Sequence, residues 1–349
     1  MYNTFKAAVL FMHGQPLKIV DNIIIPKASY GEVLVRIHYA GLCHSQLMEV
    51  QGLRGVDKYL PHMLGHEGVG IVVEVGDGVT KVKPNDEVII SWIKGSGLNT
   101  LGHQYKTIDG LLINAGAATT FSEYVIVAEN RVVLRPNATP EQLSVLYGCA
   151  IPTGFGMVMH NIPENANGSI AFIGLGGIGL SALLATKLYN FTEIFAIDVN
   201  EEKLILAKEL GANHLIDASQ HDVVPYLKSL TQGLGVDYAF ESAGTTKTIE
   251  QAFGITRAHG GSCIFASHPP HGETIQIDPF DLISGKSIKG TWGGECSPDI
   301  DMQIFDRLYA EGKLPLEYLV SKEYQLMDIN HAIDDLQNKK IVRALINCV

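Results

Sequence analysis

The stretch SIAFIGLGGIGLSALLATKLYNFTEIFAIDVN, residues 169–200, decides the fold of this chain. It opens with the apolar run Ile170–Ile173, passes through a glycine-rich turn into a helix-forming segment, and ends in a second apolar run that closes on Asp198. A strand, a helix and a second strand in this order form the repeating unit of a parallel sheet covered by helices. This stretch therefore predicts an α/β domain.

The glycine-rich turn has the spacing of a dinucleotide-binding turn, with Gly174, Gly176 and Gly179 in the pattern G-x-G-x-x-G. The first glycine permits a tight turn, the second leaves room for a pyrophosphate against the backbone, and the third lets the helix approach the sheet. The helix that begins at Gly177 and Ile178 offers free N–H groups and a positive dipole end to phosphates. A turn with no ligand is the alternative for such a motif alone.

Asp198 lies about twenty residues after the last glycine, where a carboxylate can accept a hydrogen bond from a ribose hydroxyl. The same carboxylate would repel a 2′-phosphate, and no arginine follows it directly. The sequence therefore predicts NAD rather than NADP as the cofactor.

Length, composition and charge set the class of protein. The chain has 349 residues, enough for two domains, and a formal net charge of −11, which argues against nucleic acid or an anionic membrane as a partner. The N-terminus lacks the features of a signal peptide, and no apolar run reaches the roughly eighteen residues of a membrane span. Five scattered cysteines do not suggest a disulfide framework, so we expect a reduced, cytoplasmic protein.

The chain changes character along its length. Residues 1–90 contain short β-type runs separated by Gly, Pro, Asn and Asp, which predict a β-rich, barrel-like unit. Residues 94–120 are rich in Gly, Thr and Asn and predict a long surface loop, whereas residues 121–135 again have strand character. A helical pattern follows from Pro140 to His160.

From residue 170 onward strands and helices alternate, which predicts a doubly wound parallel sheet. After Gly294 two helical patterns lead to a last strand, IVRALINC, which cannot extend that sheet. We therefore expect the tail to return to the N-terminal part. The predicted domains are a discontinuous β-rich domain, residues 1–150 and 295–349, and a dinucleotide-binding domain, residues 151–294.

Cys43, His66 and Cys149 are the candidate metal ligands. Two thiolates and an imidazole suit zinc, and three protein ligands leave one position open, as in catalytic sites. Glu67, beside His66, is either a supporting partner or an exchangeable fourth ligand. The spacing alone fits ordinary buried cysteines equally well.

The motifs around these residues resemble a known family. Gly65-His66-Glu67-Gly68-Val69-Gly70, followed by Gly76 and Val79, resembles the signature of the zinc-containing medium-chain alcohol dehydrogenases. Residues 41–45 look like the family's first-ligand loop, and Gly148-Cys149 looks like its third-ligand site. The resemblance runs to Arg343, so the chain is identified as a member. It implies a GroES-like β-rich catalytic domain joined to a Rossmann domain.

The resemblance also implies roles for matching residues. The three candidate ligands would hold one catalytic zinc, whose open position takes water or the substrate oxygen. Ser45 matches the hydroxyl that binds the reacting oxygen and starts the proton relay. His44 and Arg343 match basic groups near the pyrophosphate, and Thr153 matches a position that contacts the cofactor.

Three departures from the family bear on the chemistry. Residues 94–120 contain no cysteine, so the second, structural zinc of many members is predicted to be absent. Gln46 stands where the family usually has an aspartate that supports the ligand histidine. Met48 replaces the histidine that ends the proton relay in some members, so the proton route beyond Ser45 stays open.

Three residues are candidates for the substrate pocket. Trp92 matches an aromatic residue that the family places against the zinc, and Trp292 follows a later strand in a similar neighbourhood. His268 falls in a loop that approaches the substrate in the family, where it would favour a polar or anionic substrate. Core packing for Trp92 and a solvent-facing loop for His268 are the alternatives.

The predicted function is zinc-dependent hydride transfer between a primary or secondary alcohol and NAD, reversible with the aldehyde or ketone. A biosynthetic NADH-dependent reductase of a polar or sugar-like carbonyl is the first alternative. A zinc-free quinone reductase-like or non-catalytic cofactor-binding protein is the second, and the Cys-His-Cys set argues against it. The family forms homodimers or homotetramers, and residues 287–292 lie in a region that often pairs between subunits.

Overall fold

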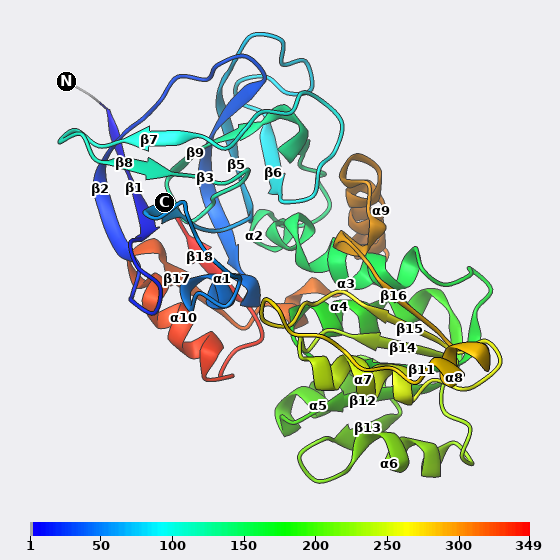
Figure 1. Cartoon of the computed structure of the whole chain (residues 1–349). Helices are drawn as coiled ribbons and strands as arrows, with labels where there is room; N and C mark the ends of the chain where they lie inside the picture. Colours follow the sequence, from blue (N-terminus) through cyan, green and yellow to red (C-terminus); the bar gives the residue numbers. More distant parts are fainter. Residues whose placement is uncertain (1–2) are drawn as a thin grey trace. The chain divides into compact units, whose positions relative to one another are not determined.

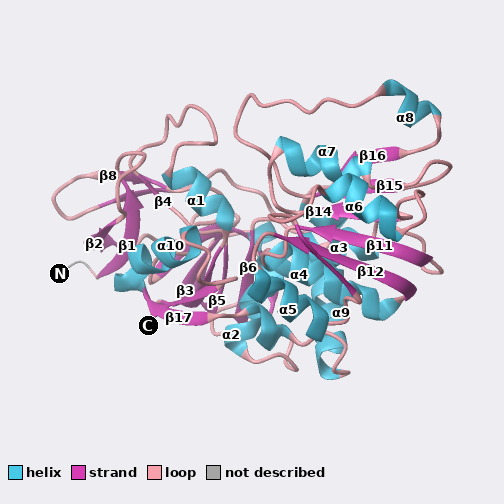
Figure 2. Cartoon of the chain, turned by 90° about the horizontal axis from the view of Figure 1, so that it is seen from below, coloured by secondary structure: helices cyan, strands magenta, loops and turns pink. Residues whose placement is uncertain are grey.

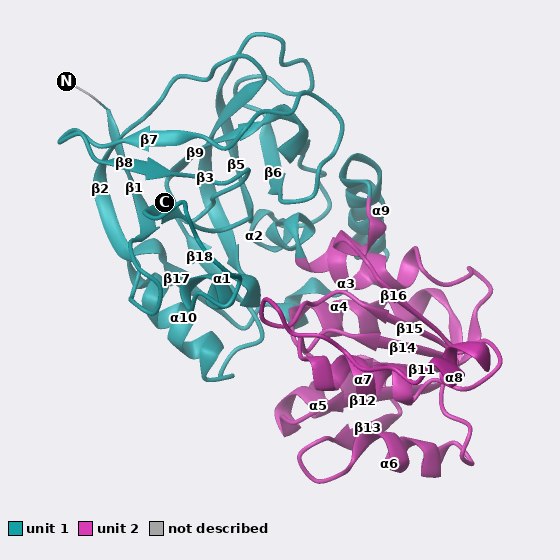
Figure 3. Ribbon diagram, in the orientation of Figure 1, with its two compact units in different colours: residues 1–149, 297–349 teal, residues 150–296 magenta. Residues whose placement is uncertain are grey.

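The computed structural model describes residues 3–349, and the first two residues of the predicted β-rich domain lie outside the described part. The chain divides into two compact units, shown in Figure 3. Residues 1–149 and 297–349 form one of them, called here the β-rich unit, and residues 150–296 form the other, called here the α/β unit.

The α/β unit is built on a six-stranded parallel sheet in the order β13-β12-β11-β14-β15-β16. The strands are β11 (Asn167–Ile173), β12 (Asn190–Asp198), β13 (His214–Asp217), β14 (Tyr238–Glu241), β15 (Ser262–Phe265) and β16 (Ser287–Gly290). The order reverses direction between β11 and β14, which is the arrangement of a doubly wound sheet with its ligand crevice at the reversal. The predicted fold class is confirmed.

Helices cover both faces of this sheet. They are α3 (Ala150–Met159), α4 (Gly177–Leu184), α5 (Glu201–Glu209), α6 (Val223–Leu230) and α7 (Thr246–Gly254), whereas the short α8 (Pro279–Ile283) buries none of its residues. Figure 2 shows α4 and α5 on one face and α6 and α7 on the other. Because both faces are covered, the central strands β11 and β14 contain buried apolar runs, and Phe172 of β11 stacks on Phe240 of β14 with ring centroids 5.6 Å apart.

The β-rich unit contains two sheets, in the orders β2-β1-β4-β8-β7 and β10-β6-β5-β3-β18-β17, with β9 also paired to β3 (Figure 1). The strands are β1 (Thr4–Leu10), β2 (Lys18–Ile24), β3 (Glu32–Leu42), β4 (His62–Met63), β5 (Glu67–Val75), β6 (Glu87–Ser91), β7 (Gln104–Lys106), β8 (Leu112–Asn114), β9 (Tyr124–Ala128), β10 (Val132–Leu134), β17 (Lys322–Gln325) and β18 (Ala344–Asn347). Alternating apolar side chains form a core between the elements, with Val35, Val125 and Ile346 fully buried.

The C-terminal tail closes the second of these sheets. Strand β18 pairs antiparallel with β3 and parallel with β17. The helices of this unit are α1 (His44–Val50), α2 (Glu141–Ser144), α9 (Pro298–Ala310) and α10 (Ile329–Gln337), and the 3-10 turn η2 (Val145–Gly148) follows α2. Pairing with β3 places Arg343, directly before β18, next to the start of α1 in the fold.

The segment 94–120, expected as a loop, contains the short hairpin of β7 and β8. Tyr105 and Ile113 face each other across it and are buried at 1% and 0% exposure, packed in one core cluster with Phe5. Each strand has three residues and only one buried side chain, which is too short a pattern to read as alternation.

Within residues 3–349 no single helix combines the length and apolar character needed to cross a bilayer. The consecutive helical segments Glu141–Gly148 and Ala150–Met159 pass that test only together, across a bend, and on length and composition alone.

Candidate active site

The three candidate metal ligands come from three separate places in the β-rich unit and converge. Cys43 directly follows β3 and is the N-cap of α1, with extended backbone angles of φ −104° and ψ 155°. His66 precedes β5 and follows Gly65, whose φ of +94° makes the turn that glycine accommodates without strain. Cys149 follows η2. Their ligand atoms all lie within 4.8 Å of one another, and His66 Nε2 is 3.1 Å from Cys149 Sγ.

This geometry fits a zinc ion. Tetrahedral zinc with bonds of about 2.3 Å to sulfur and about 2.0–2.1 Å to nitrogen places its ligand atoms within about 4 Å of one another. Both cysteines are buried, at 7% and 4% exposure, and the imidazole is half-buried. Two thiols and one imidazole can therefore close around one ion and leave a fourth position for another ligand.

The two thiols are in hydrogen-bond contact, and this contact shifts their pKa values in opposite directions. The hydrogen bond from Cys149 lowers the pKa of Cys43 well below its usual value against the opposing effect of burial, and His66 and Arg343 act in the same direction. The same contact, with burial, raises the pKa of Cys149. The contact thus favours the thiolate form of Cys43 over that of Cys149. A bound dication would favour the thiolate form of both.

A buried ion pair lies beside the cluster. Arg343 donates from Nη2 to Oε1 of Glu67, and the two residues are 2% and 0% exposed. Burial raises the pKa of Glu67 although Arg343 and His66 oppose it. Burial acts to lower the pKa of Arg343, but Glu67 and both cysteines raise it by more. Oε2 of Glu67 and Nε of Arg343 have no hydrogen-bond partner among residues 3–349.

Both members of this pair have a role predicted from the sequence: Glu67 as a possible fourth metal ligand and Arg343 as a basic group near the pyrophosphate. The Glu67 carboxylate does not belong to the group of atoms within 4.8 Å that Cys43, His66 and Cys149 form. It packs on Gly41, where a Cβ atom would lie 2.1 Å from Oε1, so only glycine fits two residues before Cys43. Glu67 and Arg343 thus lie next to the metal centre, and each keeps one polar atom available.

Two residues of the first turn of α1 have different surroundings. The Oγ atom of Ser45 is buried and has no hydrogen-bond partner within residues 3–349. A buried hydroxyl without a partner is costly unless a ligand completes it. His44 is exposed at the start of the same helix, and Met48, one turn later, is 8% exposed.

The glycine turn of the α/β unit is shaped as expected for a phosphate site. Gly174 has φ +86°, and a Cβ there would lie 2.6 Å from the Ala243 backbone nitrogen. Gly176 is the N-cap of α4, makes no side-chain cap, and would meet nothing within 4 Å if it carried a Cβ. An uncapped helix N-terminus with open space over it, here at Gly177 and Ile178, has the geometry that anion sites use. At Gly179 a Cβ would lie 1.8 Å from the Gly174 carbonyl oxygen.

Asp198 ends β12 and is held by the backbone. Its Oδ2 accepts from Leu175 N–H at 2.6 Å, within the glycine turn, and its Oδ1 accepts from Asn200 N–H at 3.0 Å. The carboxylate is therefore fixed beside the turn and is only half-buried. Thr153, on α3 of the same unit, has a buried Oγ1 without a partner among residues 3–349.

The three candidate pocket residues lie in different units. Trp92 follows β6 in the β-rich unit, is half-buried, and accepts a hydrogen bond from Arg131 at its backbone oxygen. His268 and Trp292 belong to the α/β unit, where His268 is exposed and Trp292 is 78% exposed. Nδ1 of His268 lies 3.0 Å from the backbone oxygen of Pro269.

Sequence reasoning missed a buried carboxylate at the end of β14. Glu241 is 0% exposed, and its Oε1 accepts from the N–H groups of Ala243 and Gly244, both at 2.8 Å. The hydroxyls of Thr248 and Ser267 also donate to it, at 2.8 and 2.7 Å. It thus ties together the loops that follow β14 and β15. A charged residue that ends the apolar run YAFE was the available signal.

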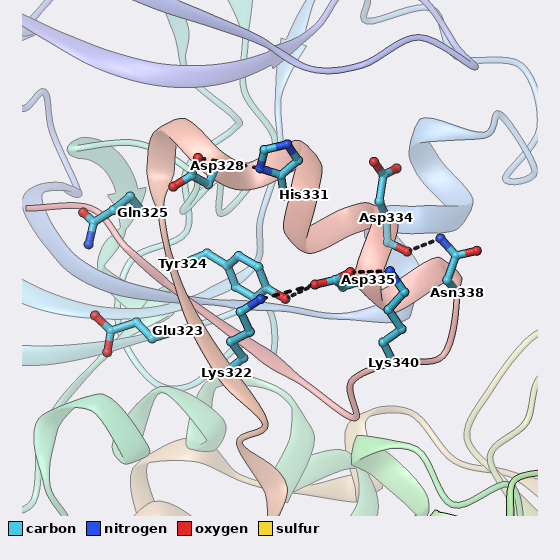
Figure 4. A pocket seen from close by; sticks show the side chains of 10 residues that line it. All are labelled: Lys322, Glu323, Tyr324, Gln325, Asp328, His331, Asp334, Asp335, Asn338 and Lys340. Carbon is cyan, nitrogen blue, oxygen red and sulfur yellow. Dashed lines mark hydrogen bonds and ion pairs between the residues drawn. The ribbon is translucent and has the colours of Figure 1, made fainter.

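A surface depression lies elsewhere in the β-rich unit, over β17 and α10 (Figure 4). In Figure 4 Asp335 lies between Lys322, Lys340 and the hydroxyl of Tyr324. The Tyr324 hydroxyl and these lysines lower the pKa of Asp335 to about 2. No metal-centre residue lines this depression, and its central charge is paired internally.

Comparisons with known proteins agree with this geometry. Residues 29–137 match the alcohol dehydrogenase GroES-like domain, and residues 177–308 match the zinc-binding dehydrogenase domain. S-(hydroxymethyl)glutathione dehydrogenase from Photobacterium damsela subsp. piscicida is 32% identical over 98% of this chain and 99% of its own. Benzyl alcohol dehydrogenase from Acinetobacter calcoaceticus, a solved structure, is 30% identical with a TM-score of 0.87, covering 99% of this chain and 100% of its own. The chain belongs to the family of zinc-containing alcohol dehydrogenases with a GroES-like and a Rossmann-type domain.

Proposed function

We propose that the chain is an NAD-dependent dehydrogenase that interconverts a primary or secondary alcohol and its aldehyde or ketone, with one catalytic zinc per chain and no structural zinc. The observation that carries the proposal is the convergence of Cys43, His66 and Cys149, with the unpartnered buried hydroxyl of Ser45 two residues after Cys43. In this proposal the β-rich unit is the catalytic domain and the α/β unit binds NAD.

The metal centre would act on the substrate oxygen. Cys43, His66 and Cys149 would hold the zinc, which as a Lewis acid favours loss of the hydroxyl proton. Oγ of Ser45 accepts that proton and, as a hydroxyl, can release its own in turn. Met48 has no titratable group, so from Ser45 the proton leaves through other hydroxyls or water rather than through this position.

The cofactor would take the hydride. The open turn around Gly176 and the N-terminus of α4 would bind the pyrophosphate of NAD, and Asp198 would accept from a ribose hydroxyl. Because two backbone N–H groups already fix the Asp198 carboxylate, the ribose meets a preorganised acceptor. The buried Oγ1 of Thr153 is available to orient the bound cofactor.

We further infer a cytoplasmic homo-oligomer, a dimer or a tetramer. All five cysteines are free and buried, which suits a reducing compartment. Strand β16 is an edge of the parallel sheet, and Phe280 and Ile283 of the nearby α8 are 69% and 80% exposed. An uncovered edge strand beside exposed apolar side chains favours pairing with a second copy.

A substrate screen that follows NADH absorbance tests the proposed activity. Zinc-loaded protein with NAD is offered simple, aromatic and polyol alcohols, together with benzyl alcohol and S-(hydroxymethyl)glutathione, because relatives carry those names. We expect turnover with at least one alcohol and reversal with its carbonyl and NADH. Absence of turnover from protein that contains less than about a tenth of a zinc per chain after metal-replete purification would instead favour a zinc-free cofactor-binding protein.

A further inference from the structure

Glu241 is a buried carboxyl group at the carboxyl edge of the parallel sheet. It ends β14 and is 0% exposed. Its hydrogen-bond donors are two backbone N–H groups and two hydroxyls, all of them neutral. Within residues 3–349 no lysine, arginine or histidine forms an ion pair with it. By contrast Asp237, which directly precedes the same strand at its other end, pairs with Arg257.

The donors favour the ionised form of this carboxyl group. Its Oε1 accepts from Ala243 N–H, Gly244 N–H and the Thr248 hydroxyl, and the two N–H groups cannot accept a proton in return. Burial raises the pKa of Glu241 above its ordinary value, although all of its donors oppose the rise. The carboxylate is thus held by neutral dipoles alone, and a buried charge without a counter-ion is costly until a cation comes near it.

The proposed cofactor brings a cation to this side of the sheet. A dinucleotide lies across the carboxyl edge of a doubly wound sheet at the point where the strand order reverses, here between β11 and β14. In the proposed function Asp198, at the end of β12, binds the ribose on one side of the reversal. The other half of the cofactor, which carries the nicotinamide ring, therefore extends over the ends of β14 and β15.

Glu241 is part of the structure of this edge. The segment that follows it packs on the glycine turn, because the Ser242 hydroxyl donates to the Gly174 carbonyl oxygen at 2.7 Å and a Cβ on Gly174 would lie 2.6 Å from the Ala243 nitrogen. The other carboxylate oxygen accepts from Ser267, in the segment that follows β15. The carboxylate thus lies between the wall of the glycine turn and the next segment along the edge.

We propose that Glu241 discriminates between the oxidised and the reduced cofactor, because its negative charge favours the cationic nicotinamide of NAD⁺ over the neutral ring of NADH. A hydride brings two electrons and one proton to the ring and so removes its positive charge. The pyrophosphate is the same in both forms, so its repulsion by Glu241 cancels in the ratio of their affinities. For a buried charge at an effective dielectric constant of about 20, the ratio should change about tenfold. The inference rests on the proposed binding of NAD by the α/β unit.

Glu241→Gln tests the charge while keeping the hydrogen bonds. The amide oxygen can accept from Ala243, Gly244 and Thr248 as before. The –NH₂ group can donate to the Ser267 hydroxyl, which accepts as well as donates. Dissociation constants of NAD⁺ and NADH are measured by titration calorimetry on the folded, zinc-loaded protein without substrate. We expect the ratio of the NAD⁺ constant to the NADH constant to rise about tenfold in the variant.

Two further variants frame this measurement. Glu193→Gln is the matched control, because it removes the same charge from a side chain of β12 that is 50% exposed and pairs with His214, and it should leave the ratio unchanged. Ser267→Lys, at a half-buried position, keeps the carboxylate and offers it a cation, so it should raise the ratio as Glu241→Gln does.

ADP-ribose, which lacks the nicotinamide ring, separates the possible outcomes. Equal loss of affinity for NAD⁺, NADH and ADP-ribose in Glu241→Gln would show a merely structural role and overturn the inference. An unchanged ratio in the folded variant would overturn it too, while leaving the cofactor site intact. Failure of the wild type to bind either NAD⁺ or ADP-ribose would instead overturn the proposed function.

Discussion

At the scale of single residues the chemistry depends on which buried side chains still have a polar atom free to bind a ligand. Cys43 and Cys149 bring two buried thiols close together, and Ser45 buries a hydroxyl with no partner among residues 3–349. Each of these states is costly in a finished core and is relieved by a ligand. The site is therefore preorganised for a cation and an oxygen that this chain does not itself supply.

Replacing Cys43 by alanine should remove the metal and the activity together. Two of three ligands cannot close a zinc site, so zinc content and hydride transfer are expected to fall to background, whereas NADH binding, which uses the α/β unit, persists. Metal analysis and NADH fluorescence titration measure the two effects. Cys348→Ala is the control, because this cysteine is equally buried in the β-rich unit but lies outside the ligand group. Retained turnover in Cys43→Ala would remove zinc from the mechanism.

Ser45→Ala should slow the reaction without releasing the metal. A positioned proton acceptor contributes about 10²–10⁴-fold, so kcat is expected to fall by that order, and Ser45→Thr, which keeps the hydroxyl, should recover most of it. Steady-state kinetics together with zinc content provide the check. A kcat of Ser45→Ala equal to that of the wild type would assign the proton step to another group.

Asp198→Ala should weaken NAD binding and narrow the preference for NAD over NADP. The ribose loses its acceptor and a 2′-phosphate loses a repelling charge, so the NAD/NADP ratio of kcat/KM should drop by about tenfold or more. Asp198→Asn separates the two effects, since it keeps an acceptor and removes only the charge. If the ratio is unchanged in both variants, Asp198 has no ribose role and only braces Leu175 and Asn200.

At the scale of elements a carboxylate holds the segment where many family members bind a second zinc. Glu129, 2% exposed at the end of β9, accepts from the N–H groups of Thr80, Lys81 and Leu98 at 2.6, 2.8 and 2.7 Å. It thereby joins the start of the 94–120 segment to the turn before β6. This clamp accounts for an ordered segment in a stretch without cysteines.

Glu129→Gln should destabilise the β-rich unit. The amide leaves at least one buried N–H without an acceptor, which costs about 1–3 kcal/mol in the free energy of unfolding. Burial raises the pKa of Glu129, but the N–H groups of Leu98, Thr80 and Lys81 lower it by more, so its pKa lies below the ordinary value. Its stabilisation is therefore present above the unfolded pKa and is lost as pH falls through the folded pKa.

Urea unfolding at pH 7 and on the acid side measures both effects. The difference between wild type and Glu129→Gln should be largest at neutral pH and shrink on acidification. Glu87→Gln is the matched control, because Glu87 is half-exposed and its side chain pairs with Arg135, and a solvent-exposed charge pair contributes little. Equal stability of wild type and Glu129→Gln would leave the segment without its proposed anchor.

Elements with long apolar runs were predictable and short ones were not. The two apolar runs that open and close the decisive stretch lie in β11, which contains Ile170–Ile173, and in β12, which ends at Asp198, because buried parallel strands are rich in consecutive apolar residues. The hairpin of β7 and β8 was missed because each strand buries one side chain. In the site, the metal ligands could be predicted from their motifs. The contact of Gln46 with both Cys43 and His66 could not, because it depends on the tertiary packing of segments twenty residues apart.

At the scale of the whole molecule the two groups of functional residues belong to separate compact units. The candidate metal ligands, Ser45 and the Glu67–Arg343 pair are in the β-rich unit, and the glycine turn, Asp198 and Thr153 are in the α/β unit. Metal binding and dinucleotide binding should therefore be separable by mutation, even though the proposed reaction requires both.

X-ray absorption at the zinc K-edge of the purified, metal-replete protein tests the central claim most directly. The account predicts about one zinc per chain bound by two sulfur atoms at about 2.3 Å and one imidazole nitrogen at about 2.0–2.1 Å, with a light atom in the remaining position. In Cys43→Ala the zinc signal itself should fall to background. Two zinc ions per chain, a four-sulfur environment, or zinc without sulfur ligands would contradict it.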